Sequence, residues 1–353
     1  MDLPKVWMVT PLKIFVLPVS GGRFPAQLGQ LSEICSLVGA PDLVLGSSGG
    51  NISAFAGMAG RWTSQGIKRV SAKIRSNHFL SPWMGKLAPS ALAFPLTGSI
   101  YGRGTGITDL LREEFPEEES PITRTEVWSG AYDTRMRLGQ MFCNRAPDDS
   151  ILSQHILSSD ARTYNCAEPI YCSGNISLLA DVCYASAALP FIVGPAEINK
   201  KAYIDGGVMF ASPLLPLQGA IKELSLTTEG RPIHMFYFEP YDLNTYYDDT
   251  TLYGEFISTL LHASVITDRA FGISIISHLA AAASTPRALT SLNDIPHTQI
   301  PEVMKSTENM FFSLYHSESS RTIDITSFNG TDVIKEVESS RKGINVRVWT
   351  SGS

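Results

Sequence analysis

PDLVLGSSGG, at residues 41–50, is the stretch that decides the fold of this chain. Its first five residues predict a buried strand, and the small, Ala- and Gly-rich residues 51–62 that follow predict a helix. A strand, a G-x-S-x-G turn and a helix are the context of a nucleophile elbow, the sharp turn that presents a reactive serine. We therefore expect Ser48 to project its hydroxyl at a helix N-terminus, where the positive end of the helix dipole favours developing negative charge.

The glycines of this turn have a steric purpose. A nucleophile elbow bends so tightly that the residues flanking the serine must be nearly without side chains. Gly46 and Gly50 meet that requirement, and Gly49 leaves room beside the hydroxyl. The alternative interpretation is an ordinary Gly- and Ser-rich loop, which the flanking strand and helix disfavour.

Another strand–helix unit precedes the elbow. Residues 13–19 predict a strand that ends in a Ser-Gly-Gly-Arg turn at 20–23, and apolar residues then recur with helical spacing between residues 28 and 38. The order along the chain is therefore strand, helix, strand, helix. That alternation predicts an α/β fold with a parallel sheet and helices on its faces.

The bulk composition limits the class of protein and its partners. A chain of 353 residues that is 44% hydrophobic and 18% charged can bury a sizeable core, as one large α/β domain with an extension or as two domains. The net charge of −6 argues against a nucleic-acid partner and against global attraction to anionic lipid.

Cysteine usage and the apolar runs favour an intracellular, cytoplasmic location. The five cysteines show no C-x-x-C pair and no framework spacing, which indicates reduced thiols, and there is no zinc signature. We predict no signal peptide, because Pro4 and its charged neighbours interrupt the N-terminus, and no transmembrane span, because no run of about 18 apolar residues exists. A glycan on the sequon at 51–53 would block Ser48.

Changes in composition divide the chain. We expect a core at residues 10–245 with an insertion or cap at 63–125, followed by a C-terminal extension at 246–353. The extension begins with a mostly helical, apolar segment at 252–283. Its end predicts a strand, a helix and a strand, at 323–328, 332–340 and 344–349.

The predicted insertion contains a run of cations, an apolar stretch at 79–101 and an acidic cluster at 113–119. Two interpretations stay open. In one, the insertion is a mobile cap whose apolar surface meets lipid while its cations meet phosphate. In the other, the charges belong to a solvated helix face beside a buried hairpin. The cations are Arg61, Lys68, Arg69, Lys73 and Arg75.

A serine hydroxyl is a poor nucleophile without a base. None of the seven histidines lies in a recognisable signature. Asp205 is a better candidate, because it follows a short predicted strand at 202–204 and begins an Asp-Gly-Gly turn with Gly206 and Gly207. It would lie at the carboxyl end of its strand, the edge at which open α/β sheets bind ligands. Taken alone, Asp-Gly is also a common turn dipeptide.

The turn at Ser20-Gly21-Gly22 is a candidate oxyanion hole. Consecutive glycines allow backbone N–H groups to converge on one point with no side chain in the way. The alternative is an ordinary loop between a strand and a helix.

Together these motifs resemble those of the patatin-like phospholipase family in order and spacing. A Gly-rich turn follows the first strand, G-x-S-x-G follows the second, and Asp-Gly-Gly follows a later one. Residues 185–190, ASAALP, also resemble the family's segment ahead of its Asp-Gly dipeptide. The resemblance covers residues 12–240. It implies a three-layer α/β fold with a central, mostly parallel sheet and helices on both faces. Residues 246–353 carry no such resemblance, and we expect them to add a C-terminal α+β extension.

The resemblance also implies an activity. The chain would cleave fatty acyl esters, as a phospholipase A or lysophospholipase does, with a Ser48–Asp205 dyad and with no metal or cofactor. Its partners would be phospholipid or another acyl lipid and a peripheral membrane surface, and not nucleic acid. The oxyanion hole would be formed by the N–H groups of Gly21 and Gly22, with Arg23 and Gly49 as candidate further donors.

Two motifs depart from the family pattern. The usual first motif reads Gly-Gly-Gly, any residue, Arg or Lys, Gly, whereas here SGGRFP at 20–25 begins with Ser20. The usual Asn-x-Pro after Asp-Gly-Gly is replaced by Ala211-Ser212-Pro213. The set of oxyanion donors therefore stays open.

Three other interpretations of Ser48 remain. A Ser–His–Asp α/β-hydrolase would take a late histidine, His297 or His316, as its base. An acyl-carrier transacylase is less favoured, because Ser47 occupies the position of that class's histidine. A catalytically silent lipid-binding or structural relative would account for the departures described above. A free aspartate has a pKa of about 3.9, so the dyad requires desolvation or close positioning of Asp205.

Overall fold

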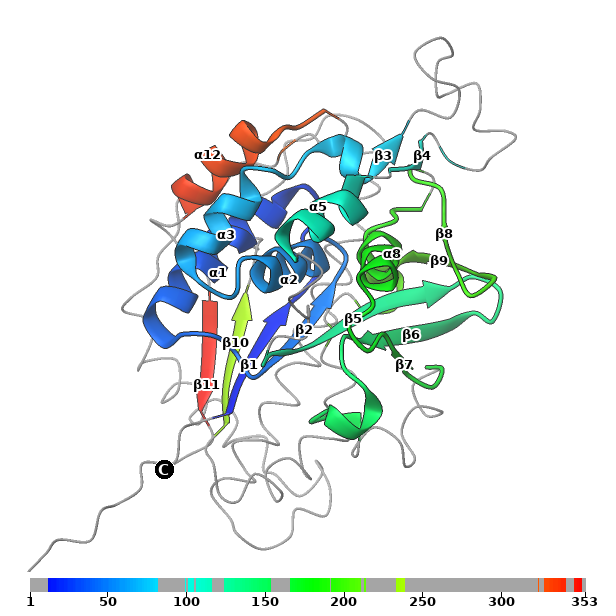
Figure 1. Cartoon of the computed structure of the whole chain (residues 1–353), viewed down its shortest axis with the longest axis horizontal. Helices are drawn as coiled ribbons and strands as arrows, with labels where there is room; N and C mark the ends of the chain where they lie inside the picture. Colours follow the sequence, from blue (N-terminus) through cyan, green and yellow to red (C-terminus); the bar gives the residue numbers. More distant parts are fainter. Residues whose placement is uncertain are drawn as a thin grey trace, which may run out of the picture.

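The computed structural model describes residues 12–81, 99, 101–104, 106–115, 124–153, 166–190, 192–210, 213, 233–238, 323, 327–340 and 346–350. Within these ranges the chain forms a nine-stranded sheet with helices packed on it (Figure 1). A second sheet has two short strands, β3 (Leu80–Ser81) and β4 (Gly102–Arg103).

The large sheet has a parallel centre. Its strand order is β11-β10-β1-β2-β5-β6-β7, with β9 paired to β5 and β8 paired to β9. Strands β10, β1, β2 and β5 run parallel, β11 is antiparallel to β10, and β6 is antiparallel to β5 but parallel to β7. This centre confirms the predicted α/β fold with a mostly parallel sheet. The strands are β1 (Leu12–Leu17), β2 (Leu43–Ser47), β5 (Glu126–Asp133), β6 (Leu138–Cys143), β7 (Ile170–Tyr171), β8 (Ala196–Ile198), β9 (Lys201–Asp205), β10 (Ile233–Phe238) and β11 (Val346–Thr350).

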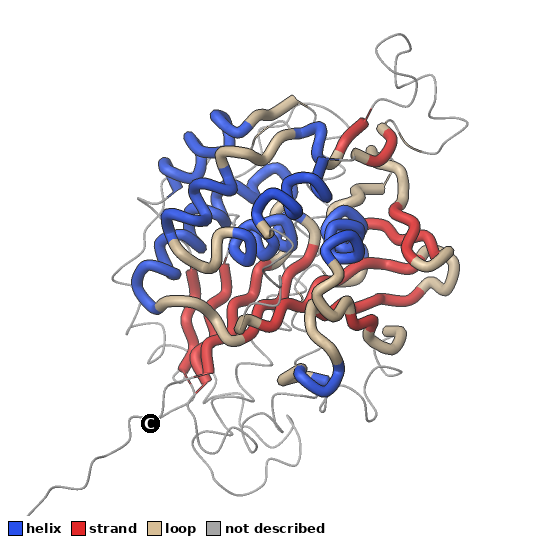
Figure 2. Tube along the Cα trace, in the orientation of Figure 1, coloured by secondary structure: helices blue, strands red, loops and turns tan. Residues whose placement is uncertain are grey.

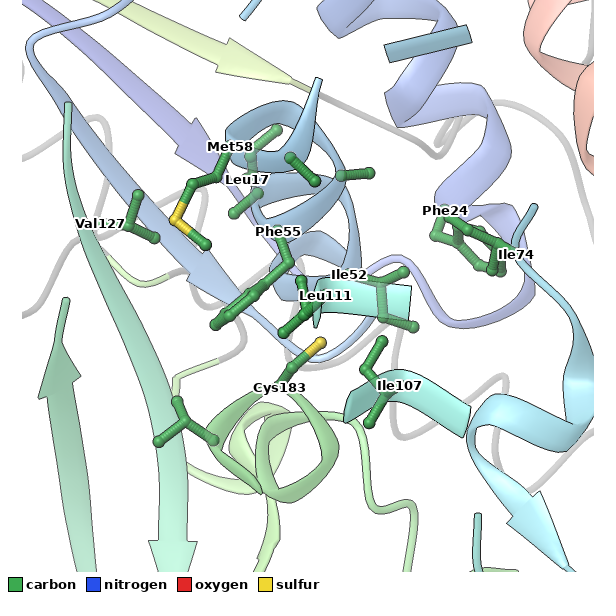
Figure 3. Packing of buried hydrophobic residues seen from close by; sticks show 14 of the residues in the cluster. Leu17, Phe24, Ile52, Phe55, Met58, Ile74, Ile107, Leu111, Val127 and Cys183 are labelled. Atoms are coloured by element: carbon green, nitrogen blue, oxygen red, sulfur yellow. The ribbon is translucent and has the colours of Figure 1, made fainter. Parts of the chain in front are cut away.

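The central strands are buried on both faces, as their continuous apolar sequences predict. Successive side chains of β1 alternate between two hydrophobic clusters, with Phe15 and Leu17 in one and Ile14 and Val16 in the other. The first cluster lies beneath the helices, where side chains from several helices meet the sheet (Figure 3). Each fully buried aliphatic or aromatic side chain contributes about 1.5–3 kcal/mol of transfer free energy.

The six longer helices of the described ranges lie on one side of the sheet (Figures 1 and 2). On the other side, the short 3-10 helix η4 (Pro147–Asp149) is followed by Leu152, which packs in the second cluster. The resemblance implies helices on both faces, and within the described residues none of the longer helices lies on this one. The helices are α1 (Phe24–Val38), α2 (Gly49–Ala59), α3 (Ser64–Ser71), α5 (Gly106–Glu114), α8 (Ile176–Ser186) and α12 (Gly330–Ser340).

Local sequence explains where several of these helices begin. The side chain of Thr63 accepts the Gly66 N–H at 3.1 Å and caps α3, and the side chain of Asn175 accepts the Leu178 N–H at 3.0 Å and caps α8. A proline, Pro25, stands in the first turn of α1, where its missing N–H costs nothing.

Part of the predicted insertion at 63–125 joins the helix layer. Helix α3 packs against α1 and α2, and α5 packs against α8. Arg69 of α3 and Lys73, two residues after α3, form ion pairs with the carboxylate of Glu114 at 2.5 and 2.7 Å, and Lys73 also pairs with Glu113. For these two cations the structure favours the helix-face interpretation over direct contact with phosphate. No helix in the described ranges is long and apolar enough to cross a membrane.

Part of the predicted C-terminal extension joins the same sheet. Strand β11 forms an antiparallel pair with β10, and α12 packs against α1 and α3. Phe328, just before α12, makes an edge-to-face contact with Phe24 at 5.6 Å between ring centroids. The predicted strand at 323–328 is not seen at its described residues, Ile323, Ser327 and Phe328. The apolar segment at 252–283 lies outside the described residues.

The five cysteines are free thiols, as their spacing predicts. Four are buried, and Cys166 is partly buried. Burial raises the pKa of Cys35 and of Cys172 to about 12, so these thiols stay protonated at neutral pH. The buried cysteines therefore act as small apolar residues of the core.

Candidate active site

The candidate site lies where two strands meet end to end beside a third. Strand β2 runs parallel to the first part of β5, and its last residue, Ser47, pairs with Gly130. Strand β9 runs antiparallel to the last part of β5, and its last residue, Asp205, pairs with Ala131. The carboxyl ends of β2 and β9 therefore face each other, one residue apart along β5.

Ser48 occupies a sharp turn between β2 and α2. Its φ is 55° and its ψ is −129°, a conformation that non-glycine residues rarely adopt and that is typical of functional sites. Gly50 lets the turn close, because a Cβ there would lie 2.1 Å from the carbonyl oxygen of Leu17. Gly46 lies in β2 and packs closely against α2, because a Cβ there would lie 3.1 Å from the Cα of Asn51. The predicted strand, turn and helix are confirmed.

The structure brings Ser48 and Asp205 together. The Ser48 hydroxyl donates a hydrogen bond to the Asp205 carboxylate, with 2.7 Å between Oγ and Oδ2. The second carboxylate oxygen accepts the N–H of Gly207 at 2.6 Å, within the 3-10 helix η5 (Gly206–Val208). Each of the two side chains is only 2% exposed. Two residues that the sequence identified separately thus form one buried pair.

Burial makes Asp205 unusually basic. Desolvation raises the pKa of its carboxyl group to about 7, although the hydrogen bonds from Ser48 and Gly207 act in the opposite direction. The sequence left two ways to obtain a base from an aspartate, desolvation and positioning. Here the same carboxylate is both desolvated and held at hydrogen-bonding distance from the serine.

The loop after β1 lies against the N-terminus of α2. The 3-10 helix η1 (Gly21–Arg23) forms this loop, and a Cβ on Gly49 would lie 2.9 Å from the backbone nitrogen of Gly21. The N–H groups of Gly21 and Gly22 precede the first hydrogen-bonded amide of the 3-10 turn, so the turn itself does not use them. The Arg23 N–H donates to the Ser20 carbonyl oxygen at 2.8 Å. Arg23 is therefore the weakest of the four expected oxyanion donors.

A buried glutamine forms hydrogen bonds to the backbone just before this loop. Gln27 of α1 donates from Nε2 to the carbonyl oxygen of Pro18, just after β1, at 2.9 Å, and to that of Phe238, the last residue of β10, at 3.4 Å. Its Oε1 accepts the hydroxyl of Ser53 from α2 at 3.4 Å. Sequence reasoning missed Gln27. The one available signal was a polar residue on the apolar stretch that forms α1.

The segment after α8 contacts both members of the pair. The N–H of Ser48 donates to the hydroxyl oxygen of Ser186 at 3.1 Å, and the N–H of Asp205 donates to the Ala188 carbonyl oxygen at 2.9 Å. The sequence drew attention to residues 185–190 only as a resemblance and gave Ser186 no part.

The histidines of the described ranges lie away from the pair. His234 is near the amino end of β10 and pairs with Lys13, whereas the site is at the carboxyl ends of the parallel strands. His78 belongs to the 3-10 helix η2 (Ser76–His78) near the small sheet. His297 and His316 lie outside the described residues. Within the described residues, no group of three His, Cys, Asp or Glu side chains could hold a metal ion.

Asn51, the acceptor of the predicted glycosylation sequon, is fully buried. Its side-chain oxygen accepts a hydrogen bond from the hydroxyl of Ser129, on β5, at 2.6 Å. A glycan on this side chain would be incompatible with the packing seen here.

Comparison with known families gives one match. A family model described as patatin-like phospholipase matches residues 20–217, more than half of the chain. The matched range begins at the loop after β1 and includes both Ser48 and Asp205. A comparison with curated proteins finds no match.

Proposed function

This chain belongs to the patatin-like phospholipase family, and from that premise we propose that it hydrolyses fatty acyl esters of lipids with a Ser48–Asp205 dyad. The family acts on lipid esters, which gives the substrate class. The observation that carries the proposal is the 2.7 Å hydrogen bond between the Ser48 hydroxyl and the Asp205 carboxylate. A buried serine beside a buried carboxylate is the arrangement that nucleophilic catalysis requires.

In the first half of the reaction, Asp205 accepts the proton of the Ser48 hydroxyl as Oγ attacks the ester carbonyl carbon. The negative charge that develops on the carbonyl oxygen is stabilised by backbone N–H groups of Gly21 and Gly22, with Gly49 as a further donor. The tetrahedral intermediate then collapses. The ester bond breaks, Asp205 returns the proton to the departing alcohol, and an acyl-serine ester remains.

In the second half, a water molecule attacks the acyl-serine carbonyl. Asp205 accepts a proton from that water, the tetrahedral intermediate collapses, and the proton returns to Ser48 Oγ as the fatty acid leaves. One water is consumed and one carboxylic acid is produced, so the enzyme ends in its starting state. For a phospholipid substrate, the alcohol product would be a lysophospholipid.

The basicity of Asp205 predicts the pH dependence. General bases work best with a pKa near the operating pH, and burial places the pKa of Asp205 at about 7. Asp205 is the active carboxylate above that pH and an inactive acid below it. We expect kcat/KM to rise with pH and to reach half its maximum near about pH 7, as measured with a soluble ester over pH 5 to 9.

Substitutions at the pair test the proposal directly. Ser48→Ala and Asp205→Asn should each abolish ester hydrolysis, and Ser48→Ala should also abolish labelling by a fluorophosphonate probe. Ser36→Ala is a matched control, because its exposed hydroxyl bonds only to the Glu33 carbonyl within α1. Full activity in either variant of the pair would end the assignment.

The same assays separate the alternatives. A Ser–His–Asp hydrolase would lose activity on substitution of His297 or His316 by Ala, whereas a dyad enzyme keeps it. A silent relative would leave the probe unreacted in a folded sample. Mass spectrometry of the products from mixed phospholipids would then distinguish phospholipase A from lysophospholipase specificity and show whether a membrane surface is required.

A further inference from the structure

We propose that Ser186 is a positioning residue that fixes the nucleophile turn, and that the short segment from Ser186 to Ala188 holds both members of the pair in register. This inference rests on the proposed function for its catalytic consequence. Its structural basis is independent, since it depends only on the backbone contacts of this segment. Ser186 is the last residue of α8, and its side chain is fully buried.

The backbone N–H of Ser48 finds no hydrogen-bond acceptor within β2 or α2, the two elements that it joins. The β2 ladder ends at Ser47, which pairs with Gly130 of β5. The next position on β5, Ala131, is already taken by Asp205 of β9, so Ser48 cannot extend the ladder. The first N–H groups of a helix have no intrahelical acceptor, so α2 cannot accept this donor either.

Ser186 supplies the missing acceptor. Its hydroxyl oxygen receives the Ser48 N–H at 3.1 Å from a residue that is 138 positions away in sequence. A buried N–H group without a partner is strongly disfavoured, and a positive φ at a non-glycine residue persists only where surrounding contacts determine it. The hydrogen bond from Ser48 to Ser186 is such a contact.

The same segment also fixes the base. Two residues after Ser186, the Ala188 carbonyl oxygen accepts the Asp205 N–H at 2.9 Å. Helix α8 packs against β5, β9 and α2, the elements that carry the pair. One rigid segment therefore sets the backbone positions of Ser48 and Asp205, while their side chains meet at 2.7 Å. The geometry of the pair depends on this common support as well as on β5.

Two substitutions at Ser186 separate hydrogen bonding from packing. Ser186→Ala removes the acceptor, and Ser186→Cys keeps a side chain of similar shape with a sulfur that accepts hydrogen bonds only weakly. Ser177→Ala is the matched control, because Ser177 lies in the first turn of α8 and its hydroxyl contacts only the exposed Arg112. The substrate is p-nitrophenyl butyrate, a soluble ester that requires no membrane surface.

We expect Ser186→Ala and Ser186→Cys to lower kcat by about 10- to 100-fold, the usual effect of a small misplacement of reacting groups, while KM changes less than about twofold. The pH of half-maximal activity should rise, because the hydrogen bond from Ser48 that lowers the pKa of Asp205 is weakened. Ser177→Ala should behave as wild type. A merely structural role would lower the melting temperature without moving the pH profile.

Hydrogen exchange tests the inference without any activity. The Ser48 amide, followed in a peptide that spans β2 and the start of α2, should exchange about tenfold faster or more in both Ser186 variants. Unchanged exchange, or a Cys variant with wild-type kcat, would overturn the inference. A wild-type protein that neither hydrolyses the ester nor reacts with a fluorophosphonate would instead refute the proposed function, and the exchange result would still decide the position of Ser186.

Discussion

Glu126 and Asp205 are buried carboxylates, one on β5 and the other on β9, which pairs with β5, and they differ in the number of hydrogen bonds that they accept. Glu126, the first residue of β5, accepts hydrogen bonds from the Trp128 indole, the Ser150 hydroxyl and the backbone N–H groups of Ile151 and Leu152. Asp205, paired near the other end of β5, accepts two, and one of these comes from Ser48.

This difference shows how similar groups acquire different tasks. The four donors around Glu126, one of which is the Ser150 hydroxyl, anchor the chain after β6 to the sheet. Asp205 is equally buried but poorly compensated, and its pKa rises to about 7. A serine donates to each carboxylate, so the difference lies in the other donors: a buried carboxylate with many donors is stabilised in place, whereas one with few donors and a raised pKa has the properties of a base.

The largest expected effect is on activity, and it separates the two carboxylates most clearly. Asp205→Asn should lower kcat by about 10²- to 10⁴-fold, the usual contribution of a general base. Glu126→Gln should leave kcat, per folded molecule, within about threefold of wild type, since Glu126 does not contact the pair. Steady-state kinetics on both variants measures these changes. For Glu126→Gln, fluorophosphonate labelling counts the active molecules, so that kcat can be given per folded molecule. Equal losses would show that the comparison is wrong.

The next effect concerns stability and pH. A carboxyl group whose pKa is higher in the folded state than in the unfolded chain stabilises the fold at low pH, and this contribution is lost as pH rises through the folded pKa. For Asp205, a rise from 3.8 to about 7 corresponds to about 4 kcal/mol lost between about pH 4 and pH 8. Asp205→Asn removes this titration.

Asp205→Asn should therefore be more stable relative to wild type at pH 8 than at pH 4, by up to about 4 kcal/mol. Urea unfolding of both proteins at the two pH values measures the difference. A constant difference between the proteins would mean that the carboxyl group does not titrate abnormally. The same variant would then lose activity without gaining stability.

A smaller effect is expected from the structural carboxylate. Glu126→Gln replaces an acceptor by an NH₂ group that faces existing donors, and one or more buried N–H groups lose their partner. We expect a loss of about 1–3 kcal/mol in the free energy of unfolding. Urea denaturation at neutral pH measures it, and Asp205→Asn under the same conditions should change in the opposite direction. An unchanged midpoint for Glu126→Gln would contradict the role given to its donors.

The smallest effect is expected at an exposed carboxylate. Glu113 on α5 pairs with Lys73 at 2.5 Å, but its side chain is 63% exposed. Solvent screens such pairs, so Glu113→Gln should leave the melting temperature within about 1 °C of wild type and the activity unchanged. Differential scanning calorimetry would detect a larger change, which would indicate that the ion pair between α5 and the segment after α3 supports the fold.

Local chemistry made Ser48 and Asp205 predictable. A glycine-rich turn after a short apolar strand is recognisable within about ten residues. Asp-Gly-Gly alone is also a common turn, and the order of the motifs, through its resemblance to a known family, is what paired Asp205 with Ser48. The alternation of strands and helices likewise predicted the parallel centre of the sheet. These features depend on neighbours in sequence.

The residues that were missed depend on partners far along the chain. Gln27 acquires its importance from the carbonyl oxygen of Phe238, and Ser186 from the amide of Ser48. Nothing in the local sequence of β11 indicates that it will pair with β10. The charge run left two interpretations open for the same reason, because the partners of Arg69 and Lys73 lie on α5, some 40 positions later.

The end-to-end arrangement of β2 and β9 also has a kinetic consequence. The serine and the aspartate are separated by 157 residues, and they meet only after β5 has paired with both strands. Contacts of such long range form late, because the chain must close a large loop before any bond compensates for it. A partly folded intermediate therefore has no reactive pair, and the onset of activity during refolding would report completion of the sheet.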